Sequence, residues 1–161
     1  MNHYMDFEYS YIDFEYSDIH LELFSREGIC INKYLGSETS VIVPTQIDDL
    51  PVTSIGKSAF EDCRSLENII IPDSVTSIGK SAFEDCRSLE NIIIPDSVTS
   101  IGRSAFYGCK SLNNIIIPDS VTSIGDEAFS GCESLGITFH ESMKNTFLLD
   151  SIDETGDYDE I

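Results

Sequence analysis

The sequence has few basic side chains. Of its 161 residues, nine are Lys or Arg and 29 are Asp or Glu, which gives a formal net charge of −20. Nucleic-acid binding depends on Lys and Arg side chains that neutralise phosphates, and anionic membrane surfaces attract the same side chains. The composition therefore excludes a general phosphate-binding protein, and we expect no nucleic-acid partner.

Long hydrophobic runs are also missing. The longest contain three or four residues, whereas a membrane-spanning helix needs about 20. We therefore expect no membrane insertion. The first residues contain no basic segment of the kind that opens a secretory signal, and acidic residues recur up to Asp18. Without a signal peptide, a cytoplasmic location is the default expectation.

Motifs of catalysis and of metal binding are absent too. The sequence has no Gly-rich phosphate loop, no Gly-x-Ser-x-Gly and no His-Glu-x-x-His. Its three histidines, His3, His20 and His140, lie near the ends, and its five cysteines include no Cys-x-x-Cys pair. We therefore expect no enzyme, no catalytic residues, no metal site and no cofactor.

What the sequence does contain is a tandem repeat with a period of 23 residues. Residues 66–88 and 89–111 differ at only four positions, and residues 112–134 follow the same pattern. An incomplete copy at 41–65 carries a five-residue insertion near Gln46–Leu50, and a degenerate copy begins at Leu135. Such self-similarity predicts a solenoid, because each unit can bury its apolar face only against its neighbours.

Each unit predicts the same series of elements. Ile69 and Ile71 alternate as in a short strand, which Pro72 ends because it cannot donate a ladder hydrogen bond. A second extended or turn segment follows, and Gly79 is expected to allow a tight bend. Residues 81–85 are expected to form one or two turns of helix. The predicted strands lie near 68–71, 91–94 and 114–117, with Ile70 beside Ile93.

The repeat pattern resembles a known family. Leu-x-x-Ile-x-Ile-Pro-x-x-Val-x-x-Ile-Gly-x-x-Ala-Phe-x-x-Cys runs from Leu66 to Cys86 and recurs in the next two units. It is similar to the BspA-like (Treponema pallidum type) leucine-rich repeat. The resemblance implies an α/β fold: a right-handed leucine-rich-repeat solenoid of about five 23-residue rungs, with a parallel β-sheet and an N-terminal β cap. It also implies a surface or secreted protein that binds host or partner proteins.

Three regions are expected along the chain: an N-terminal β-rich cap (1–34), the leucine-rich repeat array (35–140) and an acidic C-terminal tail (141–161). In the cap, alternation at 19–23 and 29–31 predicts a β-hairpin that turns near Arg26–Gly28 and covers the first rung. Phe7 is expected to contribute little to stability. In the tail, residues 143–148 suggest a short amphipathic helix, and residues 153–161 are expected to be disordered.

Equivalent residues of a solenoid stack about 4.8 Å apart, so one repeat position becomes a stripe. The phenylalanines are expected to form an aromatic spine in the core. The repeat cysteines are expected to be buried free thiols. Disulfides between rungs and metal binding are the alternatives, and the torsion that a disulfide requires disfavours the former. These positions are Phe60, Phe83, Phe106 and Phe129, and Cys63, Cys86, Cys109 and Cys132.

Two polar stripes follow from the same stacking. Hydroxyls at Thr53, Thr76, Thr99 and Thr122 are expected to satisfy turn hydrogen bonds, with a surface for carbohydrate or ice as the alternative. Like charges stacked this closely repel, so neighbouring stripes of opposite charge are expected to neutralise one another. The acidic stripe is Asp73, Asp96 and Asp119, and the basic stripes are Lys57, Lys80 and Arg103, and Arg64, Arg87 and Lys110.

The outward face of the predicted strands is the candidate binding surface. Contiguous exposed apolar residues often mark interaction sites, although β-branched side chains also stabilise strands. We therefore consider a non-catalytic protein-protein interaction module, of adhesion type, and alternatively a structural scaffold or spacer with no dedicated ligand. The near-identity of the units favours the second. The candidate residues are Ile42, Asn68, Ile70, Asn91, Ile93, Asn114 and Ile116.

Overall fold

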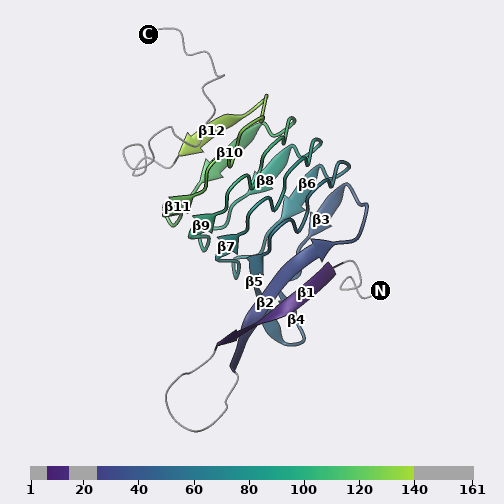
Figure 1. The fold of residues 1–161 in the computed structure, drawn as a ribbon, viewed down its shortest axis with the longest axis vertical. Helices are drawn as coiled ribbons and strands as arrows, with labels where there is room; N and C mark the ends of the chain where they lie inside the picture. Colours follow the sequence, from purple (N-terminus) through teal and green to yellow (C-terminus); the bar gives the residue numbers. More distant parts are fainter. Residues whose placement is uncertain (1–6, 15–24, 140–161) are drawn as a thin grey trace.

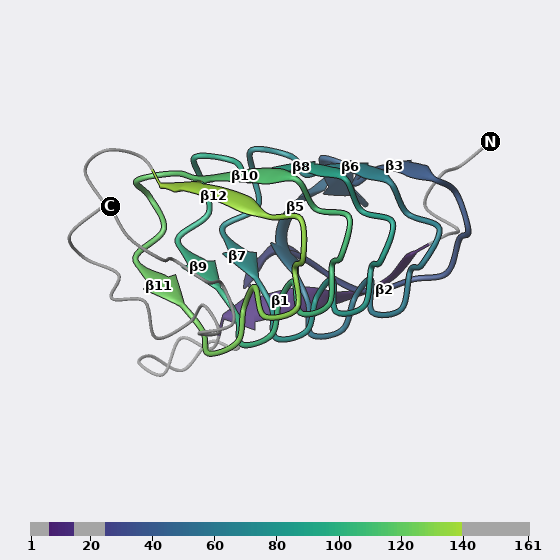
Figure 2. The ribbon, with the colours of Figure 1, turned by 90° about the horizontal axis from the view of Figure 1, so that it is seen from above.

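The computed structural model describes residues 7–14 and 25–139. The repeat units wind into a solenoid whose turns are bordered by two sheets (Figure 1). Viewed from above, the two sheets form separate sides of each turn, and irregular segments close the rest (Figure 2). The amphipathic helix and the disordered end expected in the tail lie outside the described residues. Within the described ranges, no helix is long and apolar enough to cross a membrane.

The first sheet contains one strand from each rung. Its five strands pair in the order β12-β10-β8-β6-β3, all parallel. Ile70 pairs with Ile93, as predicted. Five successive strands enclose four complete turns, so the predicted solenoid with a parallel β-sheet is confirmed. The strands are β3 (Ser40–Ile42), β6 (Asn68–Ile70), β8 (Asn91–Ile93), β10 (Asn114–Ile117) and β12 (Gly136–Phe139).

The second extended segment of each unit forms a sheet of its own. Its strands are β5 (Leu50–Ile55), β7 (Ser77–Ile78), β9 (Ser100–Ile101) and β11 (Ser123–Ile124), which pair in parallel. At the N-terminal side, β2 (Ser25–Tyr34) pairs in parallel with β5, and β1 (Phe7–Phe14) pairs antiparallel with β2. The cap therefore continues the sheet of the array.

The cap contains an antiparallel pair of strands, but β2 pairs with residues 7–14 and the predicted turn is wrong. Arg26–Gly28 lies inside β2, and residues 19–23, predicted as a strand, lie outside the described residues. Gly28 serves packing instead: a Cβ atom there would collide with the Thr53 side chain and lie 3.2 Å from the carbonyl oxygen of Pro51. Close approach of β2 to β5, rather than a bend, requires this glycine.

The insertion near Gln46–Leu50 forms a small hairpin beside the solenoid. β4 (Gln46–Ile47) pairs antiparallel with the start of β5. Asp48 and Asp49 between them have φ angles of 51° and 61°. Two positive φ values are typical of the type I′ turn, which joins adjacent antiparallel strands and favours Asp at these positions. The extra residues therefore leave the register of the repeat unchanged.

The segments around Ala-Phe are tight turns, and none of the described residues is helical, which corrects the expected helical turns. Ser81 and Asp85 have φ angles of 54° and 57°, and left-handed residues cannot continue a right-handed helix. The N–H groups alternate between two uses. Phe83 donates to the carbonyl of Ala105 in the next rung at 2.7 Å, whereas Glu84 donates locally to Ser81 at 3.2 Å. Hydrogen bonds between rungs therefore replace those of a helix.

The core confirms the aromatic spine and extends it. The rings of Phe60, Phe83, Phe106 and Phe129 stack with centroid separations of 5.1, 5.2 and 5.4 Å. Tyr34 continues the stack 5.4 Å from Phe60, and Phe7 meets Phe60 edge-on at 6.3 Å. Phe7 is only 7% exposed. The structure therefore makes Phe7 part of the core, at the end of the aromatic stack.

The cysteine stripe is partly buried. All five cysteines are free thiols; Cys86 and Cys109 are buried, whereas Cys63 and Cys132 at the ends of the stripe are half-buried. Cys86 Sγ donates to the carbonyl of Phe60 at 3.0 Å, and Cys109 Sγ donates to that of Phe83 at 3.1 Å. The packing role is confirmed for the two inner thiols, and the outer two are more accessible than predicted.

We expect a thiol reagent to separate these two pairs. The pKa of Cys86 is raised by interaction with the neighbouring Cys63 thiol and by burial, and that of Cys109 by interaction with the neighbouring Cys132 thiol and by burial. Because the thiolate is the reactive form, both should remain unlabelled at pH 8, while Cys63 and Cys132 react. Mass spectrometry of iodoacetamide-treated native protein measures this, with urea-unfolded protein as the control. Labelling of Cys86 as fast as that of Cys63 would contradict the prediction.

Candidate binding surface

The strands of the first sheet place one row of isoleucines outward. Ile42 pairs with Ile70, and Ile70 with Ile93, so these side chains lie side by side on one face. Their neighbours Ile69 and Ile92 point inward and are buried, as strand alternation requires. We call the outward row, formed by Ile42, Ile70, Ile93 and Ile116, the isoleucine stripe; its members are 70, 59, 80 and 63% exposed.

The asparagines predicted for this face lie at the start of the strands. Asn91 Nδ2 donates to Asn68 Oδ1 at 3.3 Å, and the backbones of Asn91 and Asn114 are in register. An amide donor and acceptor on each side chain allow such bonding from rung to rung. Asn68 and Asn91 therefore have a structural use, beside the more exposed isoleucine stripe.

The strand side of the solenoid is acidic. Residues 66–78, 89–101 and 112–124 contain no Lys or Arg, but they contain Glu67, Asp73, Glu90, Asp96 and Asp119. The three aspartates follow the proline that ends each strand and are exposed. They therefore border the isoleucine stripe with negative charge.

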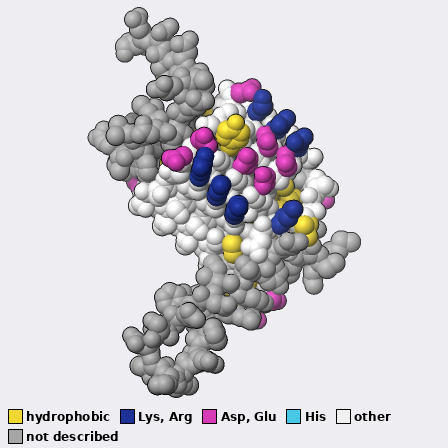
Figure 3. Space-filling view, in the orientation of Figure 1, with side chains coloured by type: hydrophobic (Ala, Val, Ile, Leu, Met, Phe, Trp, Pro, Cys, Tyr) yellow, Lys and Arg dark blue, Asp and Glu magenta, His cyan; other side chains and the backbone are white. Residues whose placement is uncertain are grey.

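The basic side chains of the array lie on the turn side instead. Figure 3 shows rows of basic side chains with acidic side chains between them. Two repeat positions in turn segments carry basic residues: Lys57, Lys80 and Arg103 at one, and Arg64, Arg87 and Lys110 at the other. Arg64 pairs with Asp62 at 2.9 Å within one rung, and Lys110 pairs with Glu133 at 2.6 Å across rungs. The basic rows therefore pair with acids of the turn side, whereas the stripe predicted to neutralise them, Asp73, Asp96 and Asp119, lies on the strand side, so the predicted partners are corrected. Exposed pairs of this kind add little stability.

A cleft interrupts the first sheet, and no pattern in the sequence indicated it. β6 and β8 are in register over three residue pairs, whereas β8 and β10 share only the pair Asn91–Asn114. The separation leaves a cleft of about 660 Å³ between β8 and β10. We call it the β8–β10 cleft; it is lined by Asn91, Ile92, Ile93, Ile94, Asp96, Ile116, Pro118, Asp119 and Ser120.

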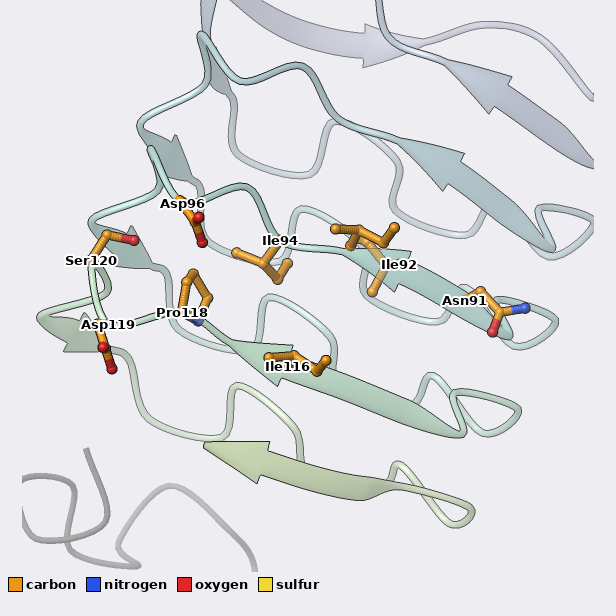
Figure 4. Close-up of a pocket in the computed structure, with 9 residues that line it drawn as sticks. Asn91, Ile92, Ile94, Asp96, Ile116, Pro118, Asp119 and Ser120 are labelled. Carbon is orange, nitrogen blue, oxygen red and sulfur yellow. The ribbon is translucent and has the colours of Figure 1, made fainter. Parts of the chain in front are cut away.

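The cleft has an apolar middle and polar ends. In Figure 4, Ile94, Pro118 and Ile116 lie along it, with Asp96, Ser120 and Asp119 grouped at one end and Asn91 at the other. Ile93 and Ile116 belong to the isoleucine stripe, so the cleft opens within the candidate surface. The structure therefore gives the surface a recessed centre as well as an exposed row.

One hydroxyl in the cleft differs from its counterparts. Ser74 Oγ donates to the carbonyl of Val52 at 2.7 Å, and Ser97 Oγ to that of Val75 at 2.6 Å. Ser120 occupies the same repeat position, yet its buried Oγ atom has no hydrogen-bond partner. A buried polar atom without a partner is costly. The fourth rung therefore leaves a donor and acceptor unsatisfied at the cleft.

The row of threonine hydroxyls predicted from the repeat has a structural role. Thr76, Thr99 and Thr122 donate through Oγ1 to the carbonyl of the equivalent threonine one rung earlier, at 3.3, 3.1 and 3.3 Å. These bonds confirm that the hydroxyls satisfy backbone groups. Across residues 7–14 and 25–139, no group of three or more His, Cys, Asp or Glu side chains is arranged to hold a metal ion.

Comparison with known proteins agrees with this architecture. The family model of the BspA type leucine rich repeat region matches residues 34–148 in six copies. The leucine-rich repeat protein of T. pallidum is 32% identical, with a TM-score of 0.61 over 83% of this chain and 68% of that one. A leucine-rich repeat protein from Bacteroides capillosus is 31% identical, with a TM-score of 0.65 over 71% of this chain and 88% of that one.

A third similar structure is the pneumococcal vaccine antigen PcpA. It is 27% identical, with a TM-score of 0.60 over 68% of this chain and 27% of the antigen. No curated protein sequence is significantly similar to the chain. The family match covers most of the chain and coincides with the repeats seen in the structure. The chain therefore belongs to the BspA-type leucine-rich repeat family.

Proposed function

We propose that this chain is a non-catalytic protein-interaction module that binds its partner through the strand face of the first sheet. The observation that carries the proposal is the isoleucine stripe: four large aliphatic side chains in one row, each at least 59% exposed. Contiguous apolar surface on a soluble protein is typical of interaction sites. Burying one such side chain against a partner contributes about 1.5–3 kcal/mol.

The rigidity of the face also supports a binding role. The isoleucines project from strands whose inward residues are buried, and β6 is paired over three residues with β3 on one side and with β8 on the other. Such a surface loses little conformational entropy when a partner binds, which favours affinity. The proposed role thus uses the array as a preformed platform.

An adhesion-type role is the narrower form of this proposal. It is supported by family membership and by the similarity to the pneumococcal vaccine antigen PcpA. A location at the cell surface or outside the cell would accompany it, and would place the stripe within reach of host or partner proteins. Localisation of the native protein tests this narrower form.

The double substitution Ile93→Lys and Ile116→Lys is expected to abolish capture of the native partner. Each lysine replaces apolar contact with a charge that a complementary apolar partner surface cannot accommodate. The measurement is a quantitative pull-down from the native source. Tyr107→Lys is the matched control, because Tyr107 is also exposed but lies in a turn segment, outside the first sheet. Loss of the partner with the control but not with the double variant would contradict the proposal.

A scaffold or spacer without a dedicated ligand is the second candidate. It is favoured by the near-identity of the units, since the outward positions repeat Asn and Ile almost unchanged. Selection for one specific partner would be expected to diversify these positions. An unchanged set of captured proteins in the Ile93→Lys, Ile116→Lys variant would favour this candidate.

A further inference from the structure

We infer that the β8–β10 cleft accepts an aliphatic side chain from a partner segment that carries Lys or Arg next to it. The inference rests on the proposed function and adds the chemistry of the partner. Its starting point is the reduced pairing between β8 and β10, which leaves a recess of about 660 Å³ in a sheet whose other neighbouring strands pair over three or four residues. Ligand pockets commonly fall in this range of volume.

The lining selects an aliphatic group for the middle of the cleft. Ile94 and Pro118 are buried and form its inner surface, while Ile93 and Ile116 stand on its rims. A side chain placed between them would remove apolar surface from water on several sides, a favourable change that scales with the buried area. A sugar or another fully polar ligand would leave these contacts unused.

The charge at the end of the cleft selects a cation. Asp96 and Asp119 line that end and are exposed. No Lys or Arg lies within 89–101 or 112–124, the segments that form both walls. Ammonium and guanidinium groups donate to carboxylates, whereas an anionic ligand would be repelled. The unsatisfied Ser120 hydroxyl at the same end can accept or donate one further hydrogen bond.

The surface around the cleft selects a polypeptide rather than a small molecule. The cleft opens onto the isoleucine stripe, with Ile93 on one rim and Ile116 on the other. An occupant that fills the cleft can therefore continue along the stripe with further aliphatic residues. A segment that combines aliphatic and basic residues matches both the row and its acidic border.

The test uses the full chain and three fluorescent synthetic peptides of equal length. The first has leucines flanked by lysines, the second has serines in place of the leucines, and the third has glutamates in place of the lysines. Fluorescence anisotropy at low salt measures their dissociation constants. The lysine–leucine peptide is expected to bind at least about tenfold more tightly than either of the others, because only it offers both groups.

Two double variants with the same net charge separate the cleft from the general acidity of the protein. Asp96→Asn with Asp119→Asn is expected to weaken binding of the lysine–leucine peptide about five- to tenfold, as the loss of two ion pairs predicts. Glu61→Gln with Asp126→Asn removes two exposed charges from turn segments, away from the acidic border of the isoleucine stripe, and is expected to change the dissociation constant less than about twofold. Circular dichroism and thermal melts confirm that both variants are folded.

Equal weakening by the two double variants would overturn the inference, since overall charge would then explain the attraction. Equal affinity for the leucine and serine peptides, or no measurable binding, would overturn it as well.

These outcomes do not use the native partner. If they occur while the Ile93→Lys, Ile116→Lys variant still loses that partner, the proposed function stands and only the partner chemistry is wrong. A pull-down that is unaffected by these lysines, with the peptide selectivity intact, would instead contradict the proposed function.

Discussion

Replacing Phe106 with Ala is expected to lower the free energy of unfolding by about 3–5 kcal/mol. Phe106 is fully buried, and its ring is stacked between Phe83 at 5.2 Å and Phe129 at 5.4 Å. The substitution removes apolar burial, leaves a cavity between two rungs and breaks two aromatic contacts. Because each rung is stabilised by its neighbours, the loss is transmitted to both sides of the array.

Urea unfolding followed by circular dichroism measures this change. Tyr107→Ala is the matched control: it is the next residue along the chain, but its side chain is 42% exposed, so its loss should cost less than about 1 kcal/mol. Phe7→Ala is expected to fall between the two, because Phe7 is buried but contacts the end of the aromatic stack. A cost for Phe106→Ala similar to that of Tyr107→Ala would show that the stack contributes little to stability.

Replacing Gly102 with Ala is expected to cost about 3 kcal/mol, since overpacking against a backbone that cannot move is strongly destabilising. A Cβ atom at Gly102 would lie 2.5 Å from the backbone nitrogen of Lys80 and 2.6 Å from the carbonyl carbon of Gly79. The obstacle is backbone in the preceding rung, and Gly102 itself donates to the carbonyl of Ile78 at 2.8 Å. The two rungs would have to separate.

Gly131→Ala is the control for this substitution. Gly131 has a φ angle of 73°, but a Cβ atom there would lie 3.4 Å from its nearest neighbours, the backbone atoms of Gly108. Alanine there should cost only about 1–2 kcal/mol, from its left-handed backbone. Thermal melts of both variants compare the two effects. If Gly131→Ala is the more damaging, backbone conformation rather than the spacing of rungs determines the need for glycine.

The sequence predicted the features that follow from its period, such as the stacking of equivalent residues. It did not predict the features that depend on which backbone atoms of neighbouring rungs come into contact. Ile70 beside Ile93 and the phenylalanine stack both follow from a 23-residue period, because equivalent residues must coincide. The role of Gly79 was predicted wrongly, as a tight bend. A Cβ atom there would lie 2.7 Å from the carbonyl carbon of Gly56, so this glycine is needed because two rungs are in close contact. Local propensity cannot show which backbone lies next to a residue in another unit.

The candidate site was predicted in part for the same reason. The outward isoleucines follow from strand alternation, and the structure places all four on one face. The β8–β10 cleft lies between units whose strand segments, 89–101 and 112–124, differ only where Asn113 replaces Glu90. Nearly equal sequences therefore pair closely between β6 and β8 and separate between β8 and β10. The cleft is a property of the stacked array, and no single unit encodes it.

The shared period of all these stripes also governs how such a gene can change in length. Duplication of one 23-residue unit would add another phenylalanine, glycine and threonine at the matching places and lengthen the molecule by about 4.8 Å. After a duplication of any other length, the extra residues would have to form a loop or hairpin outside the solenoid, as the insertion that contains β4 does. Near-identical neighbouring copies are also the substrate on which unequal recombination acts. Homologous proteins are therefore expected to carry arrays that differ by whole units.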